Sequence, residues 1–514
     1  MPEVGSCIWL VAREYEGWAS AGGVKDVVHD MSRAFTELGW QVHVCLPLYG
    51  FLKERVFQEG HLTWHGRSHH PQFVGEKECW TLEKDNLFLH FFRFSSVENK
   101  KGIYTITVDE QNSARKYIHG NGYPDTFRIN LEFQWTVAEY WFQTQQLPEK
   151  VLVHDGHCSF LPVIAKASPV WKGFFSQVPF FVLIHNAGQG YRQEMPISTE
   201  NQHLLNLPER VLKEGVWEQT WDPLVMAASY ASLATVSENY AQELLTGKND
   251  FYSGAFGRFL REYQIPLEGI TNGFDPYEYD PRFPHRSGIP YRFDPSRGDW
   301  LGKDSCRTDL MDAVLWKTTQ VHGFLKNWRL PLYVFQGRLT SQKGVDDLKD
   351  FLEKVLATDA PVNFLVMGVG EERYEKSLKQ LALRNQDSEH FLFLNFYEES
   401  LARLVFASAD FFLMPSLYEP CGLTDLKAQL MGALPIVAKV GGLVKIQDGQ
   451  TGFCYDRTKE NALWDVFQRT RQLALFRPDL LEIMRRQAFR TALSDYRWQD
   501  ILLKRYIPWF DAEA

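Results

Sequence analysis

Two series of short apolar runs, separated by stretches with helical periodicity, constrain the fold of this chain more than any other feature. In the first series, the run 7–12 (CIWLVA) precedes a glycine-containing loop and the segment 24–38, where apolar residues recur every three or four positions. Gly39 ends that segment, and the next apolar run covers 41–49. Similar runs follow at 87–94, 150–155 and 179–185. Buried strands that alternate with amphipathic helices predict a mainly parallel α/β sheet.

The same alternation begins again in the second half of the chain. Apolar runs lie at 332–339, 362–368, 390–396, 409–416 and 434–440, with helical stretches between them. Two strings of strand–helix units predict two Rossmann-like domains, and 514 residues suffice for both. Turn residues cluster in QIPLEGITNGFD, so we place one domain in 1–265 and the other in 266–494.

Composition and charge argue against several classes of protein and several kinds of partner. The formal net charge of −9 argues against nucleic acid or an anionic membrane surface as the main partner. The 7 cysteines are scattered without a CxxC pair, as expected of reduced thiols. The first residues lack the basic region of a signal peptide, and no apolar run is long enough to span a bilayer. We therefore predict a cytoplasmic protein with no nucleic-acid partner and no membrane insertion.

Four histidines gather in the stretch 61–70 (HLTWHGRSHH). The glycine within this stretch and the proline that follows it predict an exposed surface loop. A metal site is the less favoured interpretation of the same residues.

Three polar segments follow predicted strands in the first half, at the edge where open α/β sheets bind ligands. The loop with Ser20, Gly22 and Gly23 leads into a helix N-terminus, where backbone amides attract phosphate; a simple tight turn is an equal alternative. Asp155, within HDGH, is a candidate acceptor for a sugar hydroxyl, whereas its neighbouring histidines are more typical of structural hydrogen bonds. His185 also ends a predicted strand, but a lone histidine is weak evidence for a site.

The second half offers more specific chemistry. Arg338 ends a predicted strand, and the following turn brings Lys343 back toward it, so two cations converge where they can stabilise a diphosphate leaving group. Glu419 lies between a strand and a predicted helix, which places a carboxylate beside helix N-terminal amides. Downstream, 440–443 (VGGL) ends another strand and supplies a second amide-rich loop.

Several common catalytic motifs are absent from the sequence. There is no Asp-x-Asp triplet, which many metal-dependent sugar transferases use to bind a diphosphate. Neither GxxxxGK[ST] nor GxGxxG occurs, which counts against ATPase and dinucleotide-binding functions. The GxSxG motif of hydrolases is missing as well.

Eight segments together resemble the bacterial glycogen synthase and plant starch synthase family. They are SAGGVKDV (20–27), HDGH (154–157), IHN (184–186), TVSENYAQEL (235–244), ITNGFDP (270–276), GRLTSQKG (337–344), EPCGLT (419–424) and VGGL (440–443). They occur in the family's order and at roughly its spacing, so the resemblance extends over essentially the whole chain. It implies a GT-B fold, in which two Rossmann-like domains face a cleft and a last helix, here 495–514, crosses back to the N-terminal domain.

The resemblance also implies a reaction and its participants. The family transfers glucose from a nucleotide-glucose donor to an α-1,4-glucan acceptor with retention of configuration, and it needs no metal or other cofactor. ADP-glucose is favoured over UDP-glucose by this resemblance alone. By position, Arg338 and Lys343 are expected to bind the donor diphosphate, Glu419 to face the reacting carbon, and Asp155 and His185 to contact glucose. The remaining expected donor-binding positions are Ser20, Gly22, Gly23, Tyr123, Asn272, Cys421, Gly422, Leu423, Thr424, Gly441 and Gly442.

Two positions depart from the family pattern. Ser20 stands where the family has a donor-contacting lysine, and Lys25, on the first turn of the next helix, is a candidate replacement. Lys427 stands where related retaining enzymes carry a second acid that holds the ribose. Two alternatives therefore remain beside the glucan synthase: a retaining transferase with another acceptor, and a glucan-binding or regulatory homologue that has lost activity.

Overall fold

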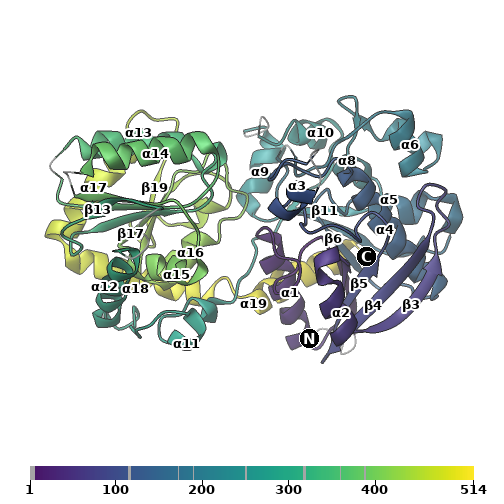
Figure 1. The fold of residues 1–514 in the computed structure, drawn as a ribbon, viewed down its shortest axis with the longest axis horizontal. Helices are drawn as coiled ribbons and strands as arrows, with labels where there is room; N and C mark the ends of the chain where they lie inside the picture. Colours follow the sequence, from purple (N-terminus) through teal and green to yellow (C-terminus); the bar gives the residue numbers. More distant parts are fainter. Residues whose placement is uncertain are drawn as a thin grey trace. The chain divides into compact units, whose positions relative to one another are not determined.

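The computed structural model describes residues 6–113, 117–171, 173–188, 190–248, 252–315, 320–358, 360–386 and 389–513. The chain forms two compact units, each built around a mainly parallel sheet (Figure 1). Unit 1 combines Met1–Gly273 with Trp498–Ala514, and unit 2 is Phe274–Arg497. Both divisions lie a few residues further along the chain than the predicted domain boundaries.

Unit 1 contains a nine-stranded sheet with β1 at its centre. The order is β12 (Glu268–Gly269), β11 (Ser232–Thr235), β7 (Phe180–Ile184), β6 (Val151–His154), β1 (Cys7–Val11), β2 (Gln41–Pro47), β5 (Leu87–Arg93), β4 (Glu76–Lys84) and β3 (His61–Arg67). The strands from β12 to β5 pair in parallel, and β4 and β3 are antiparallel. Because the chain moves from β1 to β2 on one side and to β6 on the other, the loops after β1 and β6 flank a topological switch point.

Helix α1 (Val24–Glu37) shows how the sequence pattern determines packing in unit 1. Its predicted apolar face, which includes Val27, Val28, Met31 and Phe35, is buried. The other helices are α2 (Lys53–Glu59), α3 (Val108–Ser113), α4 (Thr126–Gln143), α5 (Phe160–Ala167), α6 (Thr199–Leu205), α7 (Glu209–Glu214), α8 (Pro223–Ala227), α9 (Glu238–Thr246) and α10 (Phe256–Glu262). A small sheet is formed by β8 (Met195–Pro196), β10 (Thr220–Trp221) and β9 (Val216–Trp217).

The last segment of the chain packs against unit 1. It consists of α19 (Trp498–Ile501), a π-helical turn (Leu502–Tyr506) and α20 (Ile507–Glu513). The ring centroid of Phe510 lies 4.6 Å from that of Phe181 in β7 and 6.4 Å from that of Phe35 in α1. These aromatic contacts make the C-terminal segment part of the unit 1 core.

The prediction of a loop at 61–70 is wrong for most of that stretch. His61–Arg67 forms β3, which pairs with β4 at the edge of the sheet. Trp64 is buried there against Tyr140, with ring centroids 5.8 Å apart, while most of its strand neighbours are exposed. Polar residues and a glycine are tolerated on an edge strand because one of its faces meets water. No group of three or more metal-ligating side chains occurs among the described residues.

Unit 2 contains a seven-stranded sheet. Its order is β13 (Val321–Leu325), β16 (His390–Leu394), β15 (Asn363–Met367), β14 (Leu332–Gln336), β17 (Phe411–Met414), β18 (Leu434–Ala438) and β19 (Phe453–Tyr455). Only the edge strand β13 pairs in the antiparallel sense among these described strands. The helices are α11 (Pro284–Ser287), α12 (Leu301–Leu315), α13 (Val345–Leu356), α14 (Glu372–Arg384), α15 (Glu399–Ser408), α16 (Thr424–Leu430), α17 (Ala462–Phe476) and α18 (Pro478–Ser494).

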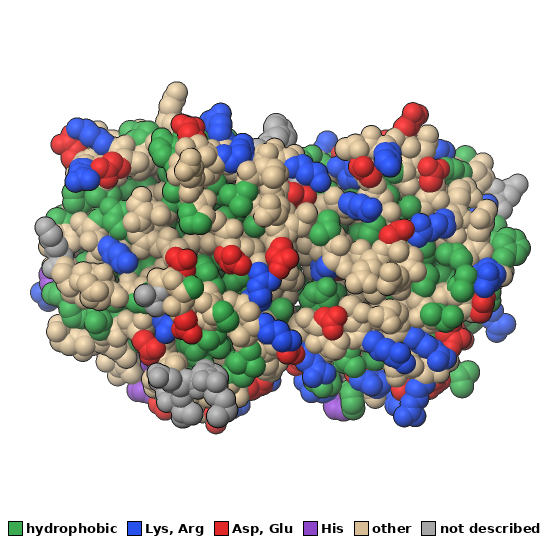
Figure 2. Space-filling model, turned by 180° about the vertical axis from the view of Figure 1, so that it is seen from behind, with side chains coloured by type: hydrophobic (Ala, Val, Ile, Leu, Met, Phe, Trp, Pro, Cys, Tyr) green, Lys and Arg blue, Asp and Glu red, His purple; other side chains and the backbone are tan. Residues whose placement is uncertain are grey.

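The exposed surface carries charges of both signs. Figure 2 shows Lys and Arg side chains interspersed with Asp and Glu side chains over the face that it presents. Within the described ranges, no helix combines the length and the apolar character that a transmembrane span requires.

Candidate active site

The carboxyl edge of the unit 2 sheet brings together three of the predicted segments. The loops 337–344, 415–424 and 440–445 follow β14, β17 and β18, which are neighbours in the sheet. Strand order reverses between β14 and β17, so these loops surround the switch point where open α/β sheets bind ligands. The topology therefore places the cationic and acidic candidates of the second half at one edge.

Lys343 and Glu419 form an ion pair at this edge. The Nζ atom of Lys343 lies 2.6 Å from Oε2 of Glu419, and the hydroxyl of the buried Ser416 donates to the same oxygen at 3.0 Å. Both charged side chains are largely buried, with 22% and 12% of their surfaces exposed. Arg338, two residues beyond the end of β14, is exposed. The ion pair and Arg338 together place one carboxylate and two cations near the ends of adjacent strands.

The backbone around Glu419 requires glycine at Gly441. This residue has a φ of 46°, and a Cβ atom placed on it would lie 1.9 Å from the carbonyl oxygen of Glu419. The next amide, of Gly442, donates to that same carbonyl at 2.9 Å. A side chain at either glycine would displace the segment that carries Glu419.

Lys445 holds the two glycine-containing loops together. Its Nζ donates to the carbonyl oxygens of Cys421 at 2.9 Å, Gly422 at 2.5 Å and Gly442 at 3.1 Å. The same ammonium lies 2.9 Å from Oδ2 of the buried Asp425, whose pKa is raised by burial. We did not single out this lysine from the sequence, because its role depends on carbonyls that only the fold brings close.

The other predicted residues of the 419–424 segment surround the start of α16. Cys421 is buried, Leu423 precedes the helix, and Thr424 is its first residue. The hydroxyl of Thr424 donates to Sδ of Met414 at 3.7 Å. The amides of this first helical turn have no intrahelical acceptors, so they can bind an anionic or hydroxyl group.

In unit 1, Asp155 and His185 lie at the carboxyl ends of neighbouring strands. Asp155 follows β6 with a φ of 58°, and its Oδ1 accepts the amides of His185 at 2.7 Å and Asn186 at 3.3 Å. Burial raises the pKa of Asp155 to about 7. Nε2 of His185 lies 2.9 Å from Nδ1 of His154, and burial lowers the pKa of His185 to about 3. Two neutral imidazoles can share one proton in this contact.

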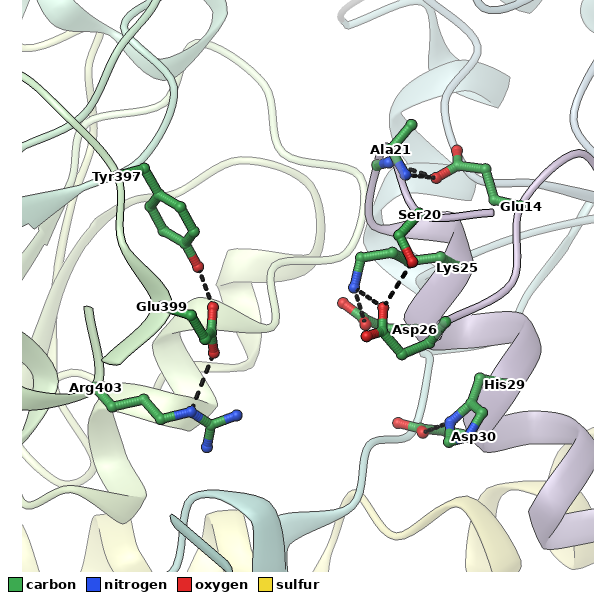
Figure 3. Close-up of polar contacts among 12 residues, drawn as sticks. Glu14, Ser20, Ala21, Lys25, Asp26, His29, Asp30, Tyr397, Glu399 and Arg403 are labelled. Atoms are coloured by element: carbon green, nitrogen blue, oxygen red, sulfur yellow. Dashed lines mark hydrogen bonds and ion pairs between the residues drawn. The ribbon is translucent and has the colours of Figure 1, made fainter. Parts of the chain in front are cut away.

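The glycine loop after β1 is closed by an internal carboxylate (Figure 3). Oε2 of Glu14 accepts the amide of Ala21 at 3.1 Å and also the amide of Gly22, while Oε1 accepts the hydroxyl of Tyr104 at 2.7 Å. The expectation that this loop offers free amides to a phosphate is therefore wrong for these two amides. At Gly23 a Cβ atom would meet nothing within 4 Å, so the space beside this backbone position is open.

Lys25 is held by carboxylates of its own unit (Figure 3). Its ammonium contacts Glu16 and lies 2.6 Å from Oδ1 of Asp26. The hydroxyl of Ser20 donates to the same Glu16 oxygen at 3.3 Å. The hydrogen bonds to Asp26 and Glu16 outweigh desolvation and raise the pKa of Lys25. The candidate replacement for the family's lysine is thus neutralised by its neighbours.

Tyr123 and Asn272, the remaining predicted positions, are both buried in unit 1. The hydroxyl of Tyr123 donates to Glu110, with oxygens 2.7 and 2.9 Å away, and accepts the amide of Gly102 at 2.9 Å. Oδ1 of Asn272 is buried without a hydrogen-bond partner among the described residues. An unsatisfied buried amide oxygen of this kind is free to accept from a ligand.

An exposed aromatic side chain at the carboxyl edge of the unit 2 sheet was missed by sequence reasoning. Tyr397 lies three residues beyond β16 and is 57% exposed. Its hydroxyl donates to Glu399, which is also paired with Arg403 at 3.0 Å (Figure 3). Arg403 in turn donates to the carbonyl of Glu278 at 2.6 Å. This chain of contacts orients a ring that can stack on a planar group.

Comparison with known proteins agrees with this architecture. Residues 7–262 match the family model described as starch synthase catalytic domain, and 331–470 match glycosyl transferases group 1. The chain is 30% identical to a glycogen synthase of Aeromonas salmonicida over 99% of this chain and 98% of the relative. It is 29% identical to glycogen synthase 1 of Synechocystis, covering 97% and 94% of the two chains.

The solved structures support the same fold. The catalytic domain of starch synthase IV from Arabidopsis thaliana, bound to ADP and acarbose, superposes with a TM-score of 0.78 at 20% sequence identity, and the match covers 99% of each chain. Sucrose-phosphate synthase from Thermosynechococcus elongatus superposes with a TM-score of 0.56 at 14% identity, covering 99% and 100% of the two chains. The two sheets are thus those of the GT-B fold. The chain belongs to the glycogen and starch synthase family of glycosyltransferases.

Proposed function

We propose that this glycosyltransferase extends an α-1,4-glucan with glucose from ADP-glucose and retains the α configuration. The observation that carries the proposal is the Lys343–Glu419 ion pair, held over glycine loops at the switch point of the unit 2 sheet. The glycogen synthase relatives support the glucan acceptor. The starch synthase structure bound to ADP and acarbose supports the nucleotide and the sugar class.

In the proposed reaction, Arg338 and Lys343 bind the donor diphosphate. An ammonium has three N–H donors, so Lys343 can keep its bond to Glu419 while it donates to a phosphate oxygen. Both cations stabilise the negative charge that develops as the bond between glucose and phosphate breaks. Glu419, which faces the reacting carbon, stabilises the positive charge on the oxocarbenium-like sugar.

The acceptor glucan forms the new bond to the glucose carbon. Its 4-hydroxyl attacks the same face of the sugar carbon and gives its proton to the departing phosphate oxygen, so no side chain has to act as general base. No metal ion takes part in the proposed reaction. Oδ1 of Asp155 is occupied by backbone amides, which leaves Oδ2 to accept a glucose hydroxyl. His185 uses Nε2 toward His154 and has Nδ1 for the same sugar.

The proposal is tested by transfer of radiolabelled glucose to glycogen, with ADP-glucose and UDP-glucose compared in the presence of EDTA. We expect incorporation from ADP-glucose that EDTA does not reduce. The Glu419→Ala variant should lose transfer while its thermal unfolding remains cooperative. If this variant incorporates as much glucose as the wild type, Glu419 is not part of the site. Dependence on a divalent metal would contradict the proposed chemistry.

One observation favours a second candidate function, a glucan-binding homologue without catalysis. Ser20 replaces a donor-contacting lysine, and Lys25 is engaged by Glu16 and Asp26. Under this alternative, folded protein would bind glycogen but incorporate glucose from neither donor. Incorporation into a small sugar but not into glycogen would instead indicate a transferase with another acceptor.

A further inference from the structure

A pocket of about 310 Å³ lies within unit 2, apart from the residues assigned to glucosyl transfer. It is bounded by α13, by the end of β19 and by the start of α17. Its lining includes the aromatic side chains Phe351, Tyr455 and Trp464. The volume is at the lower end of the range for small-molecule sites, which suits a short oligosaccharide segment.

Trp464 supplies a rigid aromatic wall to this pocket. The ring is partly exposed and packs 5.7 Å from Phe467, which is itself 5.4 Å from Phe351. Nζ of Lys354 lies 4.4 Å from the centroid of Trp464 and donates to Oδ1 of Asn461 at 2.8 Å. The site thus combines an aromatic face with a lysine whose flexible stem lets its ammonium leave the ring and bond to hydroxyls as the C–H face of a sugar packs there.

A buried hydroxyl in the same pocket lacks a protein partner. Tyr455 is 6% exposed, and its OH group makes no hydrogen bond with any described residue. The charges that act on it are those of Asp347 and Arg457, which are paired with each other at 2.6 Å. Leaving a buried hydroxyl unpaired is unfavourable, so a ligand that offers both hydrogen-bond donors and acceptors would be stabilised here.

The charges that line the pocket nearly balance. Two carboxylates, Asp347 and Asp350, face three cations, Lys354, Arg457 and Lys459. A phosphate group would be attracted by the cations but repelled by both carboxylates. A neutral ligand rich in hydroxyls can use donors and acceptors of both signs without such repulsion.

We propose that this pocket, whose lining contains none of the residues assigned to glucosyl transfer, binds a short segment of α-glucan and so anchors the acceptor polymer. The inference rests on the proposed function, because that function makes a glucan the acceptor. An anchoring site raises the local concentration of chain ends near the enzyme, so its loss should weaken binding of polymer more than transfer to short acceptors.

The test is electrophoresis of the full chain through native gels that contain glycogen, without any donor. We expect Trp464→Ala to weaken the retention constant about tenfold and Tyr455→Phe to weaken it about threefold. Trp328→Ala is the matched control, because Trp328 is also a partly exposed tryptophan of unit 2 with a cation over its ring, from Arg329 at 5.3 Å. It should be retained like the wild type, and maltoheptaose should release wild-type protein.

Transfer to maltoheptaose from ADP-glucose, measured separately, distinguishes this inference from the proposed function. We expect its rate to be unchanged in Trp464→Ala and Tyr455→Phe. If wild-type protein transfers no glucose, the proposed function fails, yet selective loss of retention would still support the site. Equal retention of all variants would overturn the inference, as would release by excess inorganic phosphate but not by maltoheptaose. Tyr455→Phe removes one oxygen only, so it tests the site even if Trp464→Ala unfolds.

Discussion

Both units place a glycine loop after a parallel strand of their sheet but use these loops differently. In unit 2, Gly441 fits closely against the carbonyl of Glu419, and Lys445 ties the neighbouring carbonyls together. In unit 1, the amides after β1 bind Glu14, and Lys25 is neutralised by Glu16 and Asp26. The loop of unit 2 is therefore packed closely around Glu419, which is paired with Lys343, whereas the loop of unit 1 is largely satisfied by its own side chains.

The largest effect should come from the cation in unit 2. Lys343→Ala should lower kcat/KM for ADP-glucose by about 10²-fold or more, because a charged donor to the leaving diphosphate is lost. The kinetics of transfer to glycogen measure this effect. Lys376→Ala, which removes an exposed lysine of α14 paired with Glu372, is the control and should behave as wild type. Similar losses in both variants would refute a specific role for Lys343.

An added methyl group should destabilise the protein more at Gly441 of unit 2 than at Gly23 of unit 1. Gly441→Ala should lower the free energy of unfolding by about 2 kcal/mol or more, because φ is positive and the methyl carbon would overlap the carbonyl of Glu419. Gly23→Ala has a φ of −78° and open space, so its free energy of unfolding should change by less than about 1 kcal/mol. Denaturant unfolding of both variants provides the measurement. Equal costs would mean that the two loops are equally constrained.

The buried carboxyl of unit 1 should make stability depend on pH. Because burial raises the pKa of Asp155 from 3.8 to about 7, the folded state binds a proton that the unfolded state releases between these values. The contribution of Asp155 to the free energy of unfolding therefore falls as pH rises from about 4 to 7, by at most about 1.4 kcal/mol per pH unit. Comparison of Asp155→Asn with wild type across this range isolates the contribution from that of the buried histidines. A difference between the two proteins that is independent of pH would contradict the raised pKa.

The smallest effect should come from the substituted position of unit 1. Ser20→Lys should lower the KM for ADP-glucose by up to about tenfold if this loop contacts the diphosphate, since it adds one charge-assisted bond. Ser20→Gln, which adds length without charge, should leave KM unchanged. The ratio of the two KM values tests whether the loop of unit 1 takes part in donor binding. Identical values would assign the diphosphate to unit 2 alone.

Local patterns were sufficient for much of the fold. The spacing of Val27, Met31 and Phe35 predicted α1, and apolar runs predicted the parallel strands. The stretch 61–70 was misassigned because its pairing with β4 is a long-range contact that its own composition does not reveal. A strand at a sheet edge can be rich in polar residues, so periodicity alone does not identify it.

The candidate site was predictable only in part. The segments that end strands were found because parallel topology places all strand ends at one edge. The contacts of Glu14 with the loop after β1, and of Lys445 with the carbonyls of Cys421 and Gly442, were not found. Both lysine and glutamate are usually surface residues, and nothing in their neighbourhood in the sequence marks them as partners of backbone groups.

We propose that the donor diphosphate binds at the carboxyl edge of the unit 2 sheet. The most direct test of this claim is the dissociation constant of ADP, measured by titration calorimetry on the full chain, for wild type, Arg338→Ala and Arg373→Ala. Arg373 is likewise exposed in unit 2 but lies on α14, paired with Glu371. We predict binding about tenfold or more weaker in Arg338→Ala and unchanged in Arg373→Ala. Equal affinity in all three proteins would contradict the claim.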